Sequence, residues 1–170
     1  MRHGNLIPLT GAAGTLLCAA SLWAQAKPPE SYPPHVLQGY VFFSAGAYIG
    51  FSETVSTIHI GMGVETLLFR GLAAGAEAGV LGAIRGSDPL GLFSLDGSYH
   101  FLRQQKIVPF LCAGYSVVGG NGRRNLVNLG GGINWWFREG KGVRLEFRDH
   151  IYADGSSRHL LGFRFGYSFR

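Results

Sequence analysis

The sequence predicts an all-β fold, an eight-stranded antiparallel up-and-down transmembrane β-barrel. The last residues read LLGFRFGYSFR, and from Leu161 they alternate apolar or aromatic side chains with small or charged ones. This period of two is typical of a β-strand with one wholly apolar face. Charged residues make up only 15% of the chain, against about 25% in ordinary soluble domains. No apolar run after residue 26 approaches the ~20 residues of a spanning helix.

The N-terminus is expected to be an export signal. Arg2 and His3 form a short basic start, an apolar stretch runs from Leu6 to Trp23, and AQA at 24–26 fits the small-x-small cleavage pattern. Pro8, Gly11 and Gly14 argue against the alternative of a spanning helix, and a Pro-rich segment follows. We therefore expect a signal peptide at residues 1–26, a Pro-rich periplasmic lead-in at 27–36 and a barrel at 37–170.

The two cysteines predict neither a disulfide nor a lipid anchor. Cys18 lies inside the expected signal and follows Leu17, which is not the small residue that lipidation requires. Cys112 then remains alone, so no disulfide framework can form. A small secreted soluble domain often needs such cross-links, whereas a barrel in a bilayer does not.

Turn signals divide residues 36–170 into eight segments, none of which shows sustained helical periodicity. The expected strands cover residues 37–51, 55–69, 72–84, 91–102, 106–118, 125–137, 142–152 and 159–169. Every link is short enough for an antiparallel hairpin. If the lead-in is periplasmic, the links at 70–71, 103–105 and 138–141 are periplasmic turns. Three of the four outward links are longer, as expected of an outer-membrane barrel.

The outward face of the strands is expected to contact lipid. Its one charge is Asp149, near the outer end of its strand. Strand 37–51 has aromatic residues on both faces and is ambiguous, and strand 106–118 carries Pro109 on its outward face. An aromatic girdle at the periplasmic interface is expected from Tyr99, Phe101, Trp135, Phe137, Tyr167 and Phe169, and an outer belt from Phe51, Phe93 and Tyr115. The alternative is that these aromatics form the core of a soluble barrel.

The inward face collects nearly all the strand charges together with many of the chain's glycines. The expected lumen charge network consists of Glu65, Glu77, Asp96, Arg144, Glu146, Arg148, Arg164, His59, His100 and His150. An eight-stranded barrel is just wide enough for side chains to fill, and buried charges must be paired. A hairpin around Gly155 would set Glu146 opposite Arg164, which suits a bidentate ion pair. The alternative function of this network is a gated ion or proton path.

No metal, cofactor or nucleic-acid site is expected. The three inward histidines lie on different strands, without HxH or HxxxH spacing. The net charge of +5 is spread singly, without a basic helix or tract. Four outward-loop arginines are possible contacts of lipopolysaccharide phosphates: Arg85, Arg123, Arg124 and Arg158. The alternative is that they only solvate the loops.

The segments GGGINWWF at 130–137 and GVRLEFRD at 142–149 resemble the penultimate hairpin of small OmpA/OmpX-like outer-membrane barrels. The resemblance extends from about residue 37 onward. It implies a monomeric, non-enzymatic protein with a structural or surface-interaction role. It also implies contact with outer-membrane lipid and lipopolysaccharide, and assembly by the barrel-assembly machinery. That machinery reads a terminal aromatic, whereas here Arg170 follows Phe169.

Two alternatives remain. Outer-membrane lipid A deacylases are barrels of similar size with a His-x-Ser motif near the C-terminus, but this chain has Tyr152 where His150 would require the serine. A nucleophilic serine and its histidine must also reach hydrogen-bond distance. The other alternative is a secreted soluble barrel of lipocalin type, which needs an apolar interior and a charged exterior.

Overall fold

The computed structural model describes residues 36–170 except 85, 87, 121 and 156. The predicted signal peptide at 1–26 and residues 27–35 of the predicted lead-in lie outside the described residues. The described residues contain no helix long and apolar enough to cross a membrane.

Eight strands account for most of the described chain, and each lies within two residues of its predicted bounds. They are β1 (Val36–Ile49), β2 (Thr54–Phe69), β3 (Leu72–Ala83), β4 (Leu90–His100), β5 (Ile107–Gly119), β6 (Arg124–Arg138), β7 (Lys141–Tyr152) and β8 (His159–Phe169). The first strand begins at Val36, one residue before the predicted start of the barrel.

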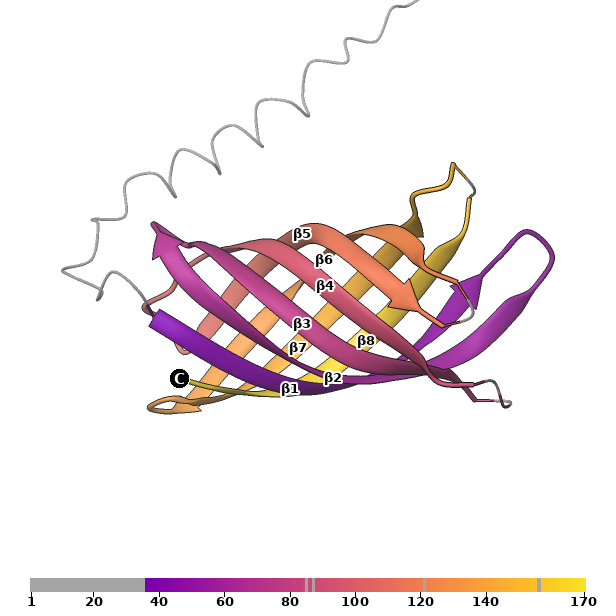
Figure 1. The fold of residues 1–170 in the computed structure, drawn as a ribbon. Coiled ribbons are helices and arrows are strands. Elements are labelled where there is room, and N and C mark those ends of the chain that lie inside the picture. The colour runs from indigo at the N-terminus through magenta and orange to yellow at the C-terminus, as the bar shows by residue number, and fades with distance from the viewer. Residues whose placement is uncertain (1–35, 85, 87, 121, 156) are drawn as a thin grey trace, which may run out of the picture. The chain divides into compact units, whose positions relative to one another are not determined.

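The strands close into a barrel in sequence order (Figure 1). Each strand pairs antiparallel with the next, and β1 pairs with β8, with Ser44 opposite Arg164. Closure leaves no strand edge unpaired, which is what a sheet needs in order to cross hydrocarbon. The predicted fold class, an eight-stranded antiparallel up-and-down transmembrane β-barrel, is confirmed.

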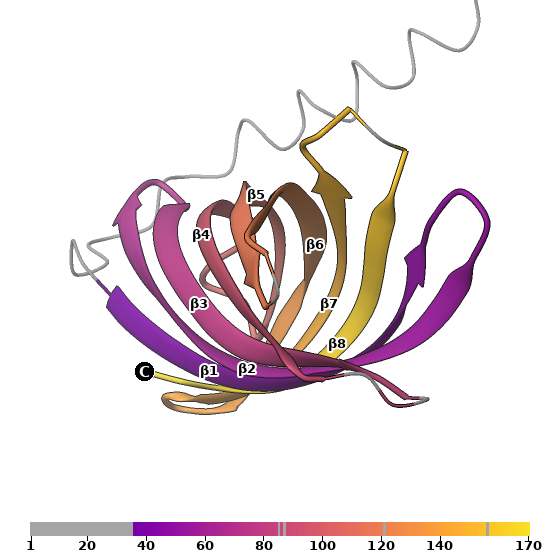
Figure 2. The same ribbon diagram turned by 45° about the vertical axis from the view of Figure 1, so that its right-hand side comes forward.

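The two ends of the barrel differ. The C-terminus and the β2–β3, β4–β5 and β6–β7 turns lie at one end, and the β1–β2, β3–β4, β5–β6 and β7–β8 loops lie at the other (Figures 1 and 2). We call these the turn end and the loop end. At the turn end, Arg70 and Gly71 have φ of 45° and 100°. Positive φ at two successive residues is typical of the tight turns whose twist matches that of a hairpin.

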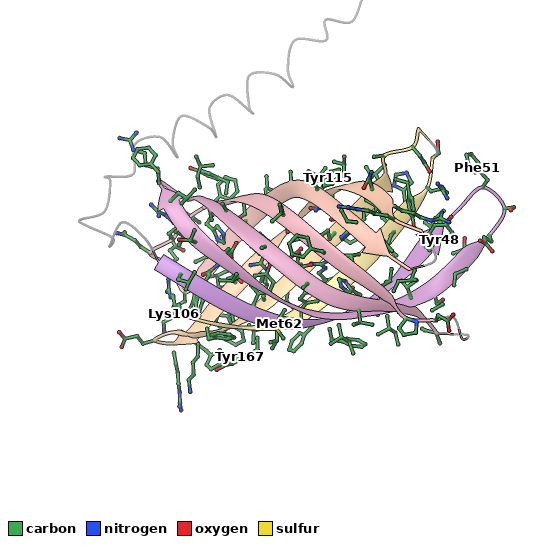
Figure 3. All side chains as sticks on the ribbon, in the orientation of Figure 1. Tyr48, Phe51, Met62, Lys106, Tyr115 and Tyr167 are labelled. Carbon is green, nitrogen blue, oxygen red and sulfur yellow. The ribbon has the colours of Figure 1, made fainter. Side chains whose placement is uncertain are left out.

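Alternation along the strands, interrupted at register shifts between Leu67 and Phe69 and between Trp136 and Arg138, separates an apolar exterior from a largely polar interior. On β8, Phe163 and Phe165 are 59% and 58% exposed, whereas Arg164 between them is 3% exposed. In Figure 3 the side chain of Met62 points away from the barrel. A lipocalin-type soluble barrel requires the reverse arrangement, so that alternative is wrong for this fold.

The two strands that the sequence left undecided follow the same alternation. On β1, Tyr40 and Phe42 point into the lumen and Phe43 points outward; on β5, Phe110 and Cys112 are lumenal. The rings of Tyr40 and Phe42 fit there because the residues opposite them on β2 are Gly63 and Gly61. A Cβ atom added at Gly61 would lie 2.6 Å from the Cζ atom of Phe42.

Candidate functional site: the lumen and its loop end

The structure places all ten residues of the expected network inside the lumen. Nine are buried, and the side chain of Asp96 is only 9% exposed. They are brought together because all ten, including the three histidines, occupy inward positions on β2, β3, β4, β7 and β8 of the closed barrel.

Glu146 is the hub of the network, although its nearest partners differ from the predicted one. It lies opposite Arg164 across the β7–β8 hairpin, as the position of Gly155 predicts. Its carboxylate, however, accepts from Arg144 Nε at 2.8 Å and from Arg148 Nε at 2.5 Å, whereas Arg164 Nη1 is 3.5 Å away. The predicted bidentate Glu146–Arg164 pair is therefore wrong. Residues two apart on a strand share a face, so the arginines flanking Glu146 reach it first.

The three guanidinium groups then extend across the lumen to three other strands. Arg144 Nη1 donates to Glu65 on β2 at 2.9 Å. Arg148 Nη1 donates to Asp96 on β4 at 2.7 Å, and Arg164 Nη1 donates to Glu77 on β3 at 2.8 Å. Each pair joins strands that are not neighbours in the sheet, so the network fastens opposite walls together.

Aromatic rings hold two of the guanidiniums in place. The guanidinium carbon of Arg144 lies 4.4 Å from the ring centre of Tyr40 and 4.0 Å from that of Phe110. That of Arg164 lies 4.4 Å from the ring centre of Phe42. Such contacts strengthen when water is excluded. The predicted network did not include these rings, because aromatic residues on both faces made the orientation of strand 37–51 ambiguous.

Further polar side chains donate to two of the carboxylates. Tyr40 donates to Glu77 Oε2 at 3.1 Å, and Ser98 donates to Glu65 Oε2 at 3.0 Å. Gln38 also donates to Glu65. Glu65 and Glu77 therefore each have more than one donor, as burial of a charge demands. Within the described residues, however, the Oε1 atom of Glu77 has no hydrogen-bond partner.

The three lumenal histidines have different surroundings. His100 Nε2 lies 3.3 Å from Glu65 Oε2, and its ring stacks on Phe110. Within the described part of the chain, neither ring nitrogen of His150 nor the Nε2 atom of His59 has a hydrogen-bond partner. Both rings line a cavity of about 10 Å³, which is about the size of one water. No cluster of three or more potential ligands suited to a metal occurs among the described residues.

Above the network, towards the loop end, an apolar layer closes the lumen. It consists of Leu81, Leu92, Val118, Leu126 and Leu160, and each is at most 7% exposed. The alternation of the strands predicted a polar network in the lumen, and these apolar residues were not part of that prediction. The signal was present, because each one shares the inward parity of its strand.

Beyond the apolar layer the loop end opens into a cavity of about 680 Å³, which we call the vestibule. Its floor includes Leu81, Val118 and Leu160, and Tyr48 and Tyr152 form part of its wall. Figure 3 shows Tyr48 at this end, and Lys106 and Tyr167 at the opposite end.

The loop arginines do not share one environment. Arg124 and Arg158 line the vestibule, Arg123 is exposed, and Arg85 lies outside the described residues. Arg158 pairs with Asp154 and lies 4.5 Å from the ring centre of Tyr152. Its hydrogen bond with Tyr48 raises the pKa of the Arg158 guanidinium. Arg124 and Arg158 are therefore turned towards the mouth of the barrel.

The expected girdle residues lie at the turn end in pairs two residues apart. Tyr99–Phe101, Trp135–Phe137 and Tyr167–Phe169 have ring centres 4.8, 6.4 and 6.5 Å apart. They lie on β4, β6 and β8, the strands that run towards this end, except Phe101, which directly follows β4. Paired aromatics at one depth suit a membrane interface.

One outward ion pair was not anticipated. His159 Nδ1 lies 2.8 Å from Asp149 Oδ2, near the loop end of β7 and β8. Thus the single acidic charge on the outward face of the strands has a partner. By contrast, His150 and Tyr152 face the lumen and the vestibule.

Comparison with known proteins identifies solved structures of similar fold. No family model matches the chain, and no curated protein matches it. The structure is similar to that of Neisserial surface protein A, NspA, with 10% identity and a TM-score of 0.66 over 79% of this chain and 97% of the other.

Two further solved structures are similar at lower scores. The N-terminal β-barrel domain of Pseudomonas aeruginosa OprF has 18% identity and a TM-score of 0.52, covering 76% of this chain and 97% of that domain. The outer membrane enzyme PagL has 15% identity and a TM-score of 0.51, covering 77% and 99%. At these identities the likeness shows the fold, a small transmembrane barrel of the kind found in outer membranes.

Proposed function

We propose that this chain is a non-enzymatic integral outer-membrane barrel with a structural or surface-interaction role. One observation carries the proposal. The exterior presents Phe163, Phe165 and many other apolar side chains, whereas Glu146 and its three arginines are sealed inside. A barrel in a bilayer is expected to have this arrangement, with apolar side chains on the outside and charged side chains on the inside. The known barrels of similar fold support the outer membrane as its location.

A conducting role is disfavoured by two successive barriers in the lumen. The ion pairs of Arg144, Arg148 and Arg164 cross its full width, and the apolar layer lies above them. An ion would have to displace paired charges and then pass five buried apolar side chains, including Leu126 and Leu92, at 0% and 2% exposure. The filled lumen instead acts as a rigid support for the loops.

The loops at the loop end are the part of the barrel that can meet partners. In this proposal they face the cell exterior, and assembly uses the barrel-assembly machinery after export. Arg123 is exposed and remains a candidate contact for lipopolysaccharide phosphates. Arg124 and Arg158 line the vestibule, so we assign them to its mouth and not to the flank of the barrel.

The test is expression of the whole chain in a diderm bacterium, followed by membrane fractionation and labelling of Glu53→Cys with a membrane-impermeant maleimide. Glu53 lies in the β1–β2 loop, and Gln104→Cys in the β4–β5 turn is the matched control. We expect outer-membrane recovery, heat-modifiable mobility and labelling of intact cells only at position 53. Recovery in a detergent-free periplasmic extract, or labelling only at position 104, would reject the proposal. Channel events in planar bilayers would reject the filled lumen.

A second candidate function, a lipid A-modifying acyl hydrolase, is favoured by the Asp149–His159 pair. An acid that contacts a histidine at Nδ1 leaves Nε2 available to activate a nucleophile. Ser157 precedes His159 by two residues and is exposed. No hydrogen bond joins the Ser157 hydroxyl to the His159 ring in the described structure, and for this reason we rank the hydrolase second.

Lipid A extracted from cells expressing the chain separates the two candidates. The hydrolase predicts lipid A that lacks an acyl chain, with the loss abolished by His159→Ala and by Ser157→Ala but not by Arg138→Gln at the turn end. Intact lipid A from cells with a correctly inserted barrel would eliminate the hydrolase and leave the structural role.

A further inference from the structure

The vestibule has the size of a small-molecule site. Its volume of about 680 Å³ falls within the ~300–1,000 Å³ typical of such sites. All four loops of this end contribute to it or flank it, through Glu53, Asp88, Gly120 and Arg158. It is therefore a concave pocket built on a rigid barrel and is not a surface groove between loops.

The floor of the vestibule requires an apolar ligand body. Leu81, Val118 and Leu160 line it from below and belong to the buried apolar layer, with Leu90 and Tyr152 packed against that layer. A ligand with an apolar part would bury that part against these side chains and displace water from them. A wholly polar ligand would leave its own hydrogen bonds unmet there.

The two halves of the vestibule rim carry residues of opposite charge. Glu53 and Asp88 come from the β1–β2 and β3–β4 loops, which are neighbours in the barrel, and both are exposed. Arg124 and Arg158 come from the start of β6 and the β7–β8 loop, on the other half. Among the described residues, Arg124 has no ion-pair partner, so that half keeps a positive charge even though Arg158 pairs with Asp154.

The basic half is also the better organised half. Arg158 is held by Asp154, by the ring of Tyr152 and by Tyr48, and its side chain is 19% exposed. The hydroxyls of Tyr48 and Tyr152 add possible donors on the same wall. A preordered cation beside neutral donors binds an anionic head with less loss of side-chain entropy than a free surface arginine would.

We propose that the vestibule binds a small amphiphile with one anionic head, the apolar body resting on the Leu81–Leu160 floor and the head meeting Arg124 and Arg158. This proposal rests on the proposed surface role in one respect: the ligand can arrive from outside the cell only if the loop end faces the cell exterior.

The direct test uses the mature barrel in lipid nanodiscs, with octanoate as the probe and methyl NMR as the readout. We expect saturable shifts at Leu81 and Leu160. The methyls of Leu67, lumenal near the turn end, should not move, and Leu129 on the outward face reports partition into the bilayer. Arg124→Gln and Arg158→Gln should each weaken octanoate binding on the order of ten-fold, as expected for loss of a charge-assisted contact.

Matched controls define the ligand class. Arg138→Gln makes the same substitution at the opposite end of β6 and should leave the affinity unchanged. Octylamine and octanamide, which have the same chain with a cationic or neutral head, should bind at least ten-fold more weakly. Because Arg158 also holds its loop, Arg124→Gln provides the decisive variant.

The inference is overturned if Leu81 and Leu160 show no saturable shift with octanoate. It is equally overturned if octylamine binds as well as octanoate, or if Arg124→Gln and Arg138→Gln behave alike. None of these results would affect heat-modifiable mobility or the surface labelling of Glu53→Cys, so failure of the inference is distinguishable from failure of the proposed function.

Discussion

The guanidinium of Arg164 lies 2.8 Å from the carboxylate of Glu77, so an ion pair joins β8 to β3 across the lumen. These strands are not neighbours in the barrel, and backbone hydrogen bonds alone would leave them connected only around its circumference. Glu77 also accepts from Tyr40 on β1. The Glu77 carboxylate therefore links three strands, β3, β8 and β1, through its contacts with Arg164 and Tyr40.

Glu77→Gln should therefore destabilise the barrel strongly. The variant leaves Arg164 with a single acidic contact, Glu146, at 3.5 Å. Breaking a buried pair by removing one partner costs about 3–5 kcal/mol. Urea-induced unfolding in phospholipid vesicles would measure the change in unfolding free energy. Glu139→Gln, at an exposed site in the β6–β7 turn, is the matched control and should change it little. Equal stabilities of the two variants would remove the structural role of the network.

Gly63→Ala tests the contact between Tyr40 and the glycine opposite it. An added Cβ would lie 2.8 Å from Tyr40 Cε2. The ring has little freedom to retreat, because its hydroxyl donates to Glu77 and Arg144 lies over its face. We expect a loss of about 1–3 kcal/mol of stability, as for other overpacked cores.

Gly97→Ala provides the comparison for Gly63→Ala. The nearest atom to a Cβ at Gly97 is the Ala113 carbonyl oxygen, 3.9 Å away. The same substitution there should be neutral or slightly stabilising, because alanine loses less conformational entropy on folding. Both variants can be compared by unfolding in the same vesicles. A Gly63 variant as stable as the Gly97 variant would show that the Tyr40 ring is not confined.

The variant Phe163→Arg tests how deeply the outward face of β8 lies in the bilayer. Phe163 lies near the middle of β8 and is 59% exposed. Phe163→Arg should lower stability by about 2–4 kcal/mol, the cost of an arginine at the bilayer midplane. Ile49→Arg, at the loop end of β1, should cost about 0–1 kcal/mol, as expected near an interface. Refolding yields into vesicles over a urea series would measure both, and a reversed order would contradict the placement of the bilayer.

For six of the eight strands the sequence was sufficient to predict which side chains point outward and which face the lumen. The period of two on β8 sets the orientation of Phe163 and Arg164, and the hairpin centred on Gly155 sets Glu146 opposite Arg164. Both follow from backbone geometry, which alternates faces and pairs residues symmetrically about a turn.

The choice of partners inside the lumen was not predictable in the same way. Arg148 reaches Asp96 on β4, and Arg164 reaches Glu77 on β3. Long side chains that cross a barrel are limited by their reach and by the space that glycines leave, and strand register does not determine either. The inward turn of Arg158 was missed for a related reason, because a loop residue has no strand parity to indicate its direction.

Trp135 and Trp136 offer the most direct test of the central claim, which is that the apolar face contacts lipid while the opposite face lines a closed lumen. These neighbours on β6 point in opposite directions, with exposures of 51% and 7%. The mature chain would be refolded into vesicles of shallowly brominated phosphatidylcholine, as single-tryptophan variants Trp136→Phe and Trp135→Phe. We predict strong quenching of Trp135 fluorescence and little quenching of Trp136. Equal quenching of the two, or stronger quenching of Trp136, would contradict the account.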